Sequence, residues 1–219
     1  MDILVRIAAI VIGYLLGSLP SAYIVARVVT GKDIRQMGGG NIGGLNTFRQ
    51  VGVLPAIIVA VADIGKGAAS VLVAYYWLGL TDLTQPWVLL SGLAAVVGHD
   101  WMVWLKFSGG RGMGATIGAL AVAMPLYGYW PGILIFIGIV VIPLAVTHNV
   151  AFSMGIGLLA TPVIAWLGIK SGLFVAWSVV TGLVIGLKFL PTARRAWTSS
   201  KNKRDFIFDR PSRSGKDKD

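Results

Sequence analysis

The sequence predicts an all-α integral membrane protein with seven transmembrane helices, and its composition and its apolar runs support that fold class. Of the 219 residues, 56% are hydrophobic and only 13% are charged, with a mean hydropathy of +0.77. A soluble domain carries about 25% charged residues. The apolar runs recur at close to the ~20 residues needed to cross a bilayer. We therefore expect one polytopic domain over residues 1–190, followed by a basic, disordered tail over residues 191–219.

The apolar segments predict seven helices, read in chain order from composition and from the polar breaks between them. The first begins directly after Asp2, and no small-residue cleavage site follows it, so it is interpreted as a span and not as a signal peptide. Tryptophans near several segment ends are typical of an interfacial aromatic belt. The fourth segment is short for a full span. The expected helices are Ile3–Val29, Val51–Tyr76, Trp87–Leu105, Ala115–Tyr127, Trp130–Val146, Ala151–Leu167 and Gly172–Leu190.

The charged residues between these helices predict the orientation of the chain. Positive charge gathers in alternate loops and in the tail, and ten of the 19 Lys and Arg residues lie from Lys188 onward. Because positive loops face the cytoplasm, we expect the N-terminus outside, the C-terminus inside and an odd number of spans. This places the two glycine-rich loops on the cytoplasmic side of the membrane. The basic tail favours contact with anionic lipid over nucleic acid.

The first glycine-rich loop is a candidate phosphate site. Glycines let backbone N–H groups close around an anion, and amide and guanidinium groups add further donors. A flexible connector is equally glycine-rich, so the side-chain donors carry the prediction. The candidate residues are Gly38, Gly39, Gly40, Asn41, Gly43, Asn46 and Arg49.

The second loop repeats this arrangement before the fourth helix. The run Gly109-Gly110-Arg111-Gly112 leads into a helix through Thr116. An arginine among glycines beside a helix N-terminus suits an anion. The loop lacks the spacing and the lysine of a nucleotide-binding P-loop, so ATP use is not indicated. We expect Arg111 to act in catalysis and its neighbours to bind phosphate.

Few other residues offer chemistry. His99 precedes the second loop and is a candidate general base, although a histidine that holds the loop backbone is the favoured alternative. Asp63 and Lys66 lie three apart on one helix face and form either a structural ion pair or part of a phosphate site. The chain has no cysteine and no glutamate, and its histidines and aspartates show no metal-ligand spacing. We expect no metal and no cofactor.

These motifs together resemble the PlsY family, the acyl-phosphate:glycerol-3-phosphate acyltransferases of bacteria. The resemblance rests on residues of the first helix, both glycine-rich loops and the second helix. The matching stretches are Gly17-Ser18-Leu19-Pro20-Ser21-Ala22-Tyr23, Asp33-Ile34-Arg35, Gly40-Asn41-Ile42-Gly43 with Asn46 and Arg49, Asp63-x-x-Lys66-Gly67, Gly98-His99 and Phe107-x-Gly109-Gly110-Arg111-Gly112-x-x-x-Thr116. It covers about residues 10 to 120 well, and the rest only in hydropathy.

The resemblance implies a seven-span inner-membrane enzyme of phospholipid biosynthesis. Its substrates would be acyl phosphate and glycerol 3-phosphate, and its products lysophosphatidic acid and phosphate. The first loop with Arg49 would hold one phosphate and the second loop with Arg111 the other. A fatty chain would lie in a groove between helices, open to lipid.

Two alternatives stay open at this point. The family usually has serine and threonine where this chain has Gly39 and Leu45, and a serine where it has Ala151. These differences favour a divergent relative that binds a phosphorylated lipid or another acceptor. Glycine-rich broken helices also line transport sites, so an anion transporter is the third hypothesis, although no inverted repeat is evident.

Overall fold

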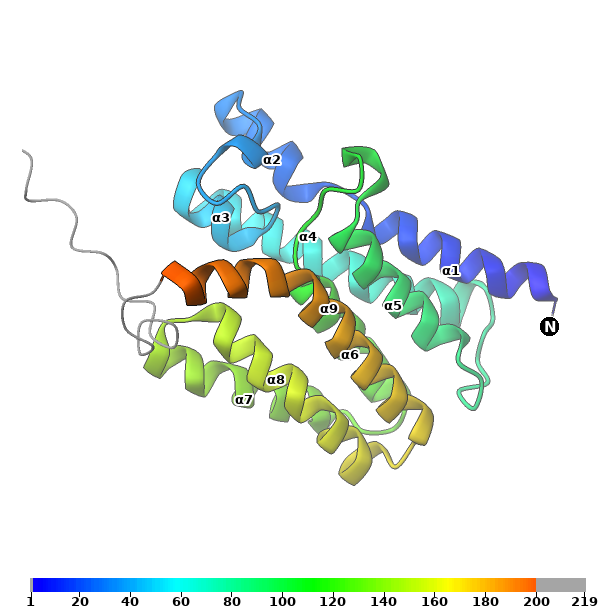
Figure 1. Cartoon of the computed structure of the whole chain (residues 1–219). Coiled ribbons are helices and arrows are strands. Elements are labelled where there is room, and N and C mark those ends of the chain that lie inside the picture. The colour runs from blue at the N-terminus through cyan, green and yellow to red at the C-terminus, as the bar shows by residue number, and fades with distance from the viewer. Residues whose placement is uncertain (1, 200–219) are drawn as a thin grey trace, which may run out of the picture.

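The computed structural model describes residues 2–199, and the regular elements in that range are helices (Figure 1). Most of the predicted tail, residues 200–219, lies outside the described residues. The α-helices are α1 (Ile3–Gly17), α2 (Ser21–Thr30), α3 (Gly44–Gln50), α4 (Val53–Leu72), α5 (Trp87–Asp100), α6 (Met113–Leu126), α7 (Pro131–Thr147), α8 (Val150–Ile164) and α9 (Gly172–Ser199). Short 3-10 segments (Ile34–Gln36, Val103–Leu105) and π segments (Val73–Trp77, Ala165–Ile169) complete the helical structure.

The helices confirm an all-α protein suited to a membrane. Four described stretches are long and apolar enough to cross a bilayer, and three shorter apolar helices accompany them. The long stretches are Ile3–Thr30, Val53–Trp77, Val150–Ile169 and Gly172–Pro191, and the shorter helices are α5, α6 and α7. The seven crossings and the orientation of the termini stay predictions.

The outer surface of the bundle differs from the surface of a soluble protein. Large apolar residues are exposed along the outside of the bundle, as Val28 (80%) and Leu159 (81%) illustrate. The interior holds large apolar side chains such as Phe136 together with small and polar ones such as Ser70 and Ser91. Lipid is as apolar as leucine, so membrane helices associate through small residues that allow close packing and through hydrogen bonds.

The first predicted helix, Ile3–Val29, is wrong as a continuous element. It is broken at Ser18–Pro20, so that α1 and α2 are separate helices. A proline disfavours the helical conformation of the residue before it and cannot donate a backbone hydrogen bond. The break at Pro20 leaves the carbonyl of Leu19 without a helical partner.

Two other helix ends also differ from the prediction. α5 ends at Asp100 instead of Leu105, because Trp101 leaves the helical conformation (φ −132°, ψ 74°). α9 continues to Ser199 instead of ending at Leu190, with Pro191 inside it. Membrane helices tolerate an internal proline because neighbouring groups compensate for the lost hydrogen bond.

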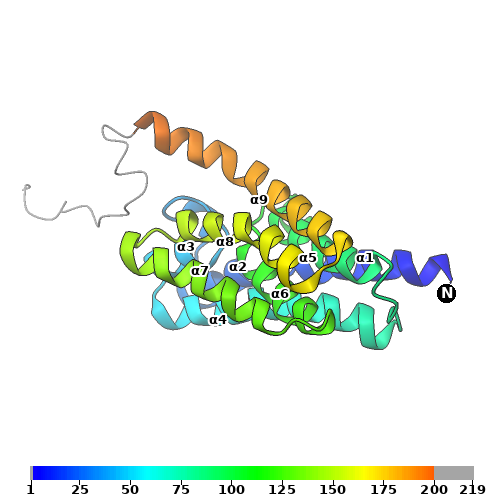
Figure 2. The same ribbon diagram turned by 90° about the horizontal axis from the view of Figure 1, so that it is seen from below.

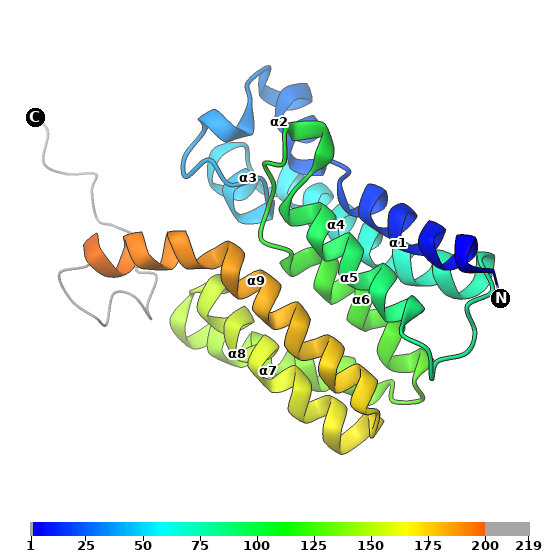
Figure 3. The same cartoon turned by 45° about the vertical axis from the view of Figure 1, so that its right-hand side comes forward.

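The helices form two groups that meet where α5 packs against α9 and α6 packs against α7. Helices α1, α4, α5 and α6 pack together in one group, and α7, α8 and α9 form the other. Figures 1 and 3 show the two groups side by side, with α2 and α3 at one end of the first. Figure 2 shows the start of α1 and the end of α9 at opposite ends of the bundle. The glycine-rich loops lie at the end away from the start of α1 (Figure 3).

Glycines set the closest helix approach, between α4 and α6. A Cβ atom at Gly118 of α6 would overlap the backbone carbonyl of Ile64, and one at Gly67 of α4 would overlap that of Ala115. Each helix therefore presents a glycine to the backbone of the other. Such contacts bring the N-terminus of α6 against the middle of α4, where Asp63 lies.

We expect Gly118→Ala to lower the free energy of unfolding by about 1–3 kcal/mol, as overpacking does. The thermal unfolding midpoint in detergent is the measurement. Gly65→Ala is the matched control, because a Cβ there meets no atom within 4 Å and alanine favours a helix by about 0.5–1 kcal/mol over glycine. Equal midpoints for the two variants would contradict the proposed close contact.

Candidate functional site

A cavity of about 230 Å³ lies where the two glycine-rich loops meet. Most of its lining is apolar, but Asn41, Asp63, His99 and Arg111 also line it, and we call it the polar cavity. It joins residues that are far apart in the sequence, from the first loop, α4, the end of α5, the second loop, α6 and the start of α8. The lining residues are Asn41, Gly43, Gly44, Leu45, Ala60, Asp63, Ile64, His99, Arg111, Met113, Gly114, Ile117, Val150 and Ala151.

Gly110 is the point of contact between the loops. Its N–H donates to the carbonyl of His99 at 2.9 Å. A Cβ atom at this position would overlap Nε2 of His99 and would lie 2.7 Å from the carbonyl oxygen of Ile42 in the first loop. Only glycine therefore lets the second loop pass between the imidazole and the first loop. Gly112, at φ +64°, then turns the chain into α6.

The first loop is held by one buried amide. The side-chain nitrogen of Asn46 donates to the carbonyls of Met37 and Asn41, both at 3.0 Å, with Ile34 further away at 3.4 Å. These contacts close the loop on the start of α3. Because its donors face backbone carbonyls, Asn46 positions the loop, whereas Asn41 lines the cavity.

An ion pair fixes the approach to this loop. The guanidinium of Arg35 lies 2.6 Å from the carboxylate of Asp33 and contacts it through two nitrogens. These hydrogen bonds lower the pKa of Asp33 from its ordinary value. Ile34 between them is fully buried. The Asp33-Ile34-Arg35 stretch thus anchors the loop and does not line the cavity.

Arg111 is the principal cation of the cavity. Its guanidinium lies 5.0 Å from the centre of the Phe189 ring on α9. Within residues 2–199, no carboxylate lies within 4.0 Å of it. Burial lowers its pKa from the ordinary value, yet arginine stays charged in proteins. A positive charge without a carboxylate, beside the N-terminus of α6, is suited to an anion.

Asp63 is the centre of a buried charge cluster on the cavity wall. It accepts a hydrogen bond from Oγ of Ser21 at 2.6 Å and pairs with Nζ of Lys66 at 2.9 Å. Lys66 also donates to the carbonyl of Leu19 at 3.1 Å. The break between α1 and α2 supplies both of these contacts. Asp63 and Lys66 therefore form a buried ion pair, and Lys66 faces the helix break instead of the cavity.

His99 connects this cluster to the second loop. Its Nδ1 lies 3.5 Å from Oδ1 of Asp63, and its side chain is buried. Its Nε2 faces Gly110. The imidazole thus packs between Asp63 and the second loop, and at 3.5 Å its Nδ1 makes no hydrogen bond within the described residues. The imidazole still forms part of the cavity wall.

The other predicted site residues lie around the cavity. Arg49 is on the exposed surface of α3 and does not line it. Thr116 is buried, and its hydroxyl donates to the carbonyl of Gly112 at 2.8 Å, which secures the start of α6.

The remaining glycines shape the loops. Gly38, Gly39 and Gly40 form the outer turn of the first loop, and Gly38 and Gly40 adopt positive φ. Gly109 packs its Cα against the backbone of His99 and Asp100.

Sequence reasoning missed several residues of the site. Ser21 was part of a recognised stretch but was not predicted to contact Asp63. A proline-induced helix break opposite two charges on another helix is the signal that indicates such a contact. Gly114 lines the cavity and packs against Asp63. Val150 also lines the cavity, beside Ala151, the position where the family usually has serine.

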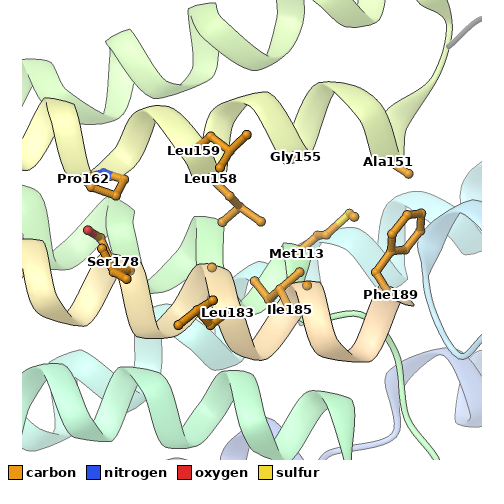
Figure 4. Close-up of a pocket in the computed structure, with 13 residues that line it drawn as sticks. Met113, Ala151, Gly155, Leu158, Leu159, Pro162, Ser178, Leu183, Ile185 and Phe189 are labelled. Carbon is orange, nitrogen blue, oxygen red and sulfur yellow. The ribbon is translucent and has the colours of Figure 1, made fainter. Parts of the chain in front are cut away.

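An apolar groove of about 340 Å³ continues from the polar cavity between α8 and α9. Met113 and Ala151 line both spaces. Figure 4 shows Ala151 and Phe189 at one end of the groove and Pro162 and Ser178 at the other. The remaining walls come from Gly155, Leu158, Leu159, Val179, Gly182, Leu183, Ile185 and Gly186. A polar cavity that opens into an apolar groove suits a molecule with one charged end and one long apolar end.

Comparison with known proteins agrees with this arrangement. Residues 7–199 match the model of the family described as glycerol-3-phosphate acyltransferase. The chain belongs to the glycerol-3-phosphate acyltransferase family. The protein named glycerol-3-phosphate acyltransferase 1 of Dehalococcoides mccartyi is 47% identical over 92% of this chain and 95% of its own length. Glycerol-3-phosphate acyltransferase 2 of the same organism is 37% identical over 87% and 86%.

A solved structure confirms the fold of the acyltransferase family for this chain. The crystal structure of PlsY (YgiH), described as an integral membrane glycerol 3-phosphate acyltransferase in its glycerol 3-phosphate form, superposes with a TM-score of 0.78. It is 22% identical and covers 88% of this chain and 92% of its own. At that identity the likeness shows the fold alone.

We expect Lys66→Met in this acyltransferase to lower the free energy of unfolding by about 3–5 kcal/mol, because Asp63 then stays buried without its cation. Thermal unfolding in detergent measures the effect. The double variant Asp63→Leu/Lys66→Met removes both charges and should be less destabilised than Lys66→Met alone. The single variant Asp63→Leu completes the comparison. If the losses in free energy of unfolding of the two single variants add up to the loss of the double variant, Asp63 and Lys66 do not stabilise each other.

Proposed function

We propose that this chain transfers a fatty acyl group from acyl phosphate to the 1-hydroxyl of glycerol 3-phosphate at the polar cavity. By family it is a glycerol-3-phosphate acyltransferase, a membrane enzyme of phospholipid biosynthesis. The proposal adds the acyl phosphate donor, the residues of the site and its cytoplasmic orientation. The observation that supports it most is the cavity lined by both glycine-rich loops, where Arg111 has no carboxylate of the described residues within 4.0 Å.

Phosphate binding follows from the donors that the cavity presents. Arg111 offers a forked set of N–H groups that matches phosphate geometry. Backbone N–H groups at the start of α6, near Met113 and Gly114, add the partial positive charge of a helix N-terminus. Asn41 and Gly43 face the same space from the first loop. We assign this set to phosphate, with Arg49 at the edge of the first loop as the second cation.

The reaction requires little acid–base chemistry from the protein. The 1-hydroxyl oxygen attacks the carbonyl carbon of acyl phosphate, a new ester C–O bond forms and the bond to the phosphate oxygen breaks. The departing phosphate takes the proton of the hydroxyl. Acyl phosphate is already activated, so holding the two substrates in line supplies much of the rate through effective molarity. Arg111 stabilises the negative charge on the leaving phosphate.

His99 and Asp63 prepare this site in the proposal. The imidazole contacts the carboxylate through Nδ1 and Gly110 through Nε2. It therefore fixes the path of the second loop and with it the base of Arg111. We assign His99 a positioning role, and proton transfer to the leaving phosphate makes a separate general base unnecessary.

The apolar groove takes the fatty chain of the donor. It begins at Met113 and Ala151, which also line the polar cavity. An acyl phosphate with its head at Arg111 directs its chain into this groove, between α8 and α9. The proposed topology has seven crossings, with the N-terminus outside. The cavity then faces the cytoplasm, where soluble glycerol 3-phosphate is present.

We expect Arg111→Ala to lower kcat/KM at least about 100-fold, as the loss of a donor to developing charge does. The purified protein is given acyl phosphate and glycerol 3-phosphate, and phosphate release and lysophosphatidic acid are measured together. Arg111→Lys keeps the charge but not the fork and should retain part of the activity. Arg49→Ala tests the second cation. We expect a smaller loss of kcat/KM for this variant, because Arg49 lies outside the cavity.

Three outcomes would contradict the proposal. Binding of glycerol 3-phosphate without phosphate release would indicate a binding protein of the same fold. Uptake of glycerol 3-phosphate into vesicles without acyl transfer would indicate a transporter. Full activity in Arg111→Ala would show that the leaving phosphate is held elsewhere.

A further inference from the structure

We infer that three glycines in the apolar groove, Gly155, Gly182 and Gly186, set the length of the acyl chain that the enzyme accepts. The inference rests on the proposed function and specifies the substrate class. All three line the groove, Gly155 from α8 and the other two from α9. A Cβ atom at any of them would meet no other atom within 4 Å. The groove therefore exists where these side chains are missing.

Both walls of the groove are long enough to hold most of a fatty chain. Ala151 and Pro162 are 11 residues apart in α8, and Phe189 and Ser178 are 11 residues apart in α9. At about 1.5 Å per residue, each wall runs for roughly 16 Å. Carbon–carbon bonds of about 1.5 Å at tetrahedral angles advance an extended chain by roughly 1.25 Å per carbon. The groove thus holds about 13 carbons beyond the polar cavity.

The groove runs from the polar cavity to a far end, so each residue that lines it corresponds to a point along the acyl chain. Phe189 contacts Arg111 and marks the end beside the polar cavity. Figure 4 shows Ser178 beside Pro162 at the far end. By helix rise, Gly186 lies about 4.5 Å from Phe189 and Gly182 about 10 Å. A side chain at Gly186 would block the groove after about four carbons, and one at Gly182 after about eight.

The test measures acyl transfer from donors of 8, 12 and 16 carbons for each variant. We expect Gly182→Leu to lower the ratio of kcat/KM for the 16-carbon donor to that for the 8-carbon donor about tenfold or more, since it displaces several methylenes from the groove. Its activity with the 8-carbon donor should stay within about twofold. Gly186→Leu should impair all three donors, and Ser178→Leu only the longest. Donors enter the same micelles in every case, so comparison with the unchanged protein cancels partitioning.

Gly138→Leu is the matched control. Gly138 lies on α7, its Cβ would also meet no atom within 4 Å, and it does not line the groove. Its ratio of kcat/KM for the 16-carbon donor to that for the 8-carbon donor should equal the ratio of the unchanged protein. The inference is overturned if Gly182→Leu leaves the ratio unchanged, or if Gly138→Leu shifts it equally.

A binding measurement separates this inference from the proposed function. A non-hydrolysable 16-carbon acyl phosphonate should raise the thermal midpoint of the unchanged protein and of Gly138→Leu, but not that of Gly182→Leu. An unchanged protein that transfers no acyl group but shows this pattern would refute the activity while supporting the groove. Active protein with equal phosphonate binding in all variants would refute the groove alone.

Discussion

The buried carboxylate of Asp63 is the interaction on which the rest of the site depends. It joins α2 through Ser21, its own helix through Lys66 and α5 through His99. A charge inside a membrane protein is costly unless it is paired, so the cluster requires these elements to stay together. Gly114 packs α6 directly against the same residue. One paired charge therefore holds together the helices that carry both glycine-rich loops.

The break between α1 and α2 belongs to this constraint. A continuous helix would use the carbonyl of Leu19 internally and would direct Ser21 along the helix surface. With Pro20 interrupting it, the chain offers the carbonyl of Leu19 to Lys66 and the hydroxyl of Ser21 to Asp63. The loss of helical hydrogen bonds is thus offset by contacts with two buried charges. Polar backbone at membrane depth is stable only where protein groups satisfy it in this way.

The sequence predicted the all-α membrane fold and singled out both glycine-rich loops, but it did not predict the direction of each side chain. Arg111 stands out because an arginine among glycines before a helix has few structural uses, and it lines the cavity. Asn46 and Arg49 have equally suitable donors, yet Asn46 faces backbone carbonyls and Arg49 lies on the exposed side of α3. The rotation of α3, a seven-residue helix, about its own axis decides where both side chains point. Tertiary contacts set that rotation. The Ser21 contact likewise depends on which helix faces the break.

Glycine has two opposite effects in this bundle, and the neighbouring helix decides which one applies. At Gly67 and Gly118 the missing side chain is replaced by the backbone of the facing helix, which brings α4 and α6 together. At Gly182 and Gly186 no atom takes that space, so the absence remains as a groove. In a bilayer an empty apolar groove is filled by hydrocarbon, whose chains gain contacts with its walls. In the proposed function, a substrate with a fatty chain therefore exchanges with lipid at little cost, while the cavity beside Asp63 holds its charged head.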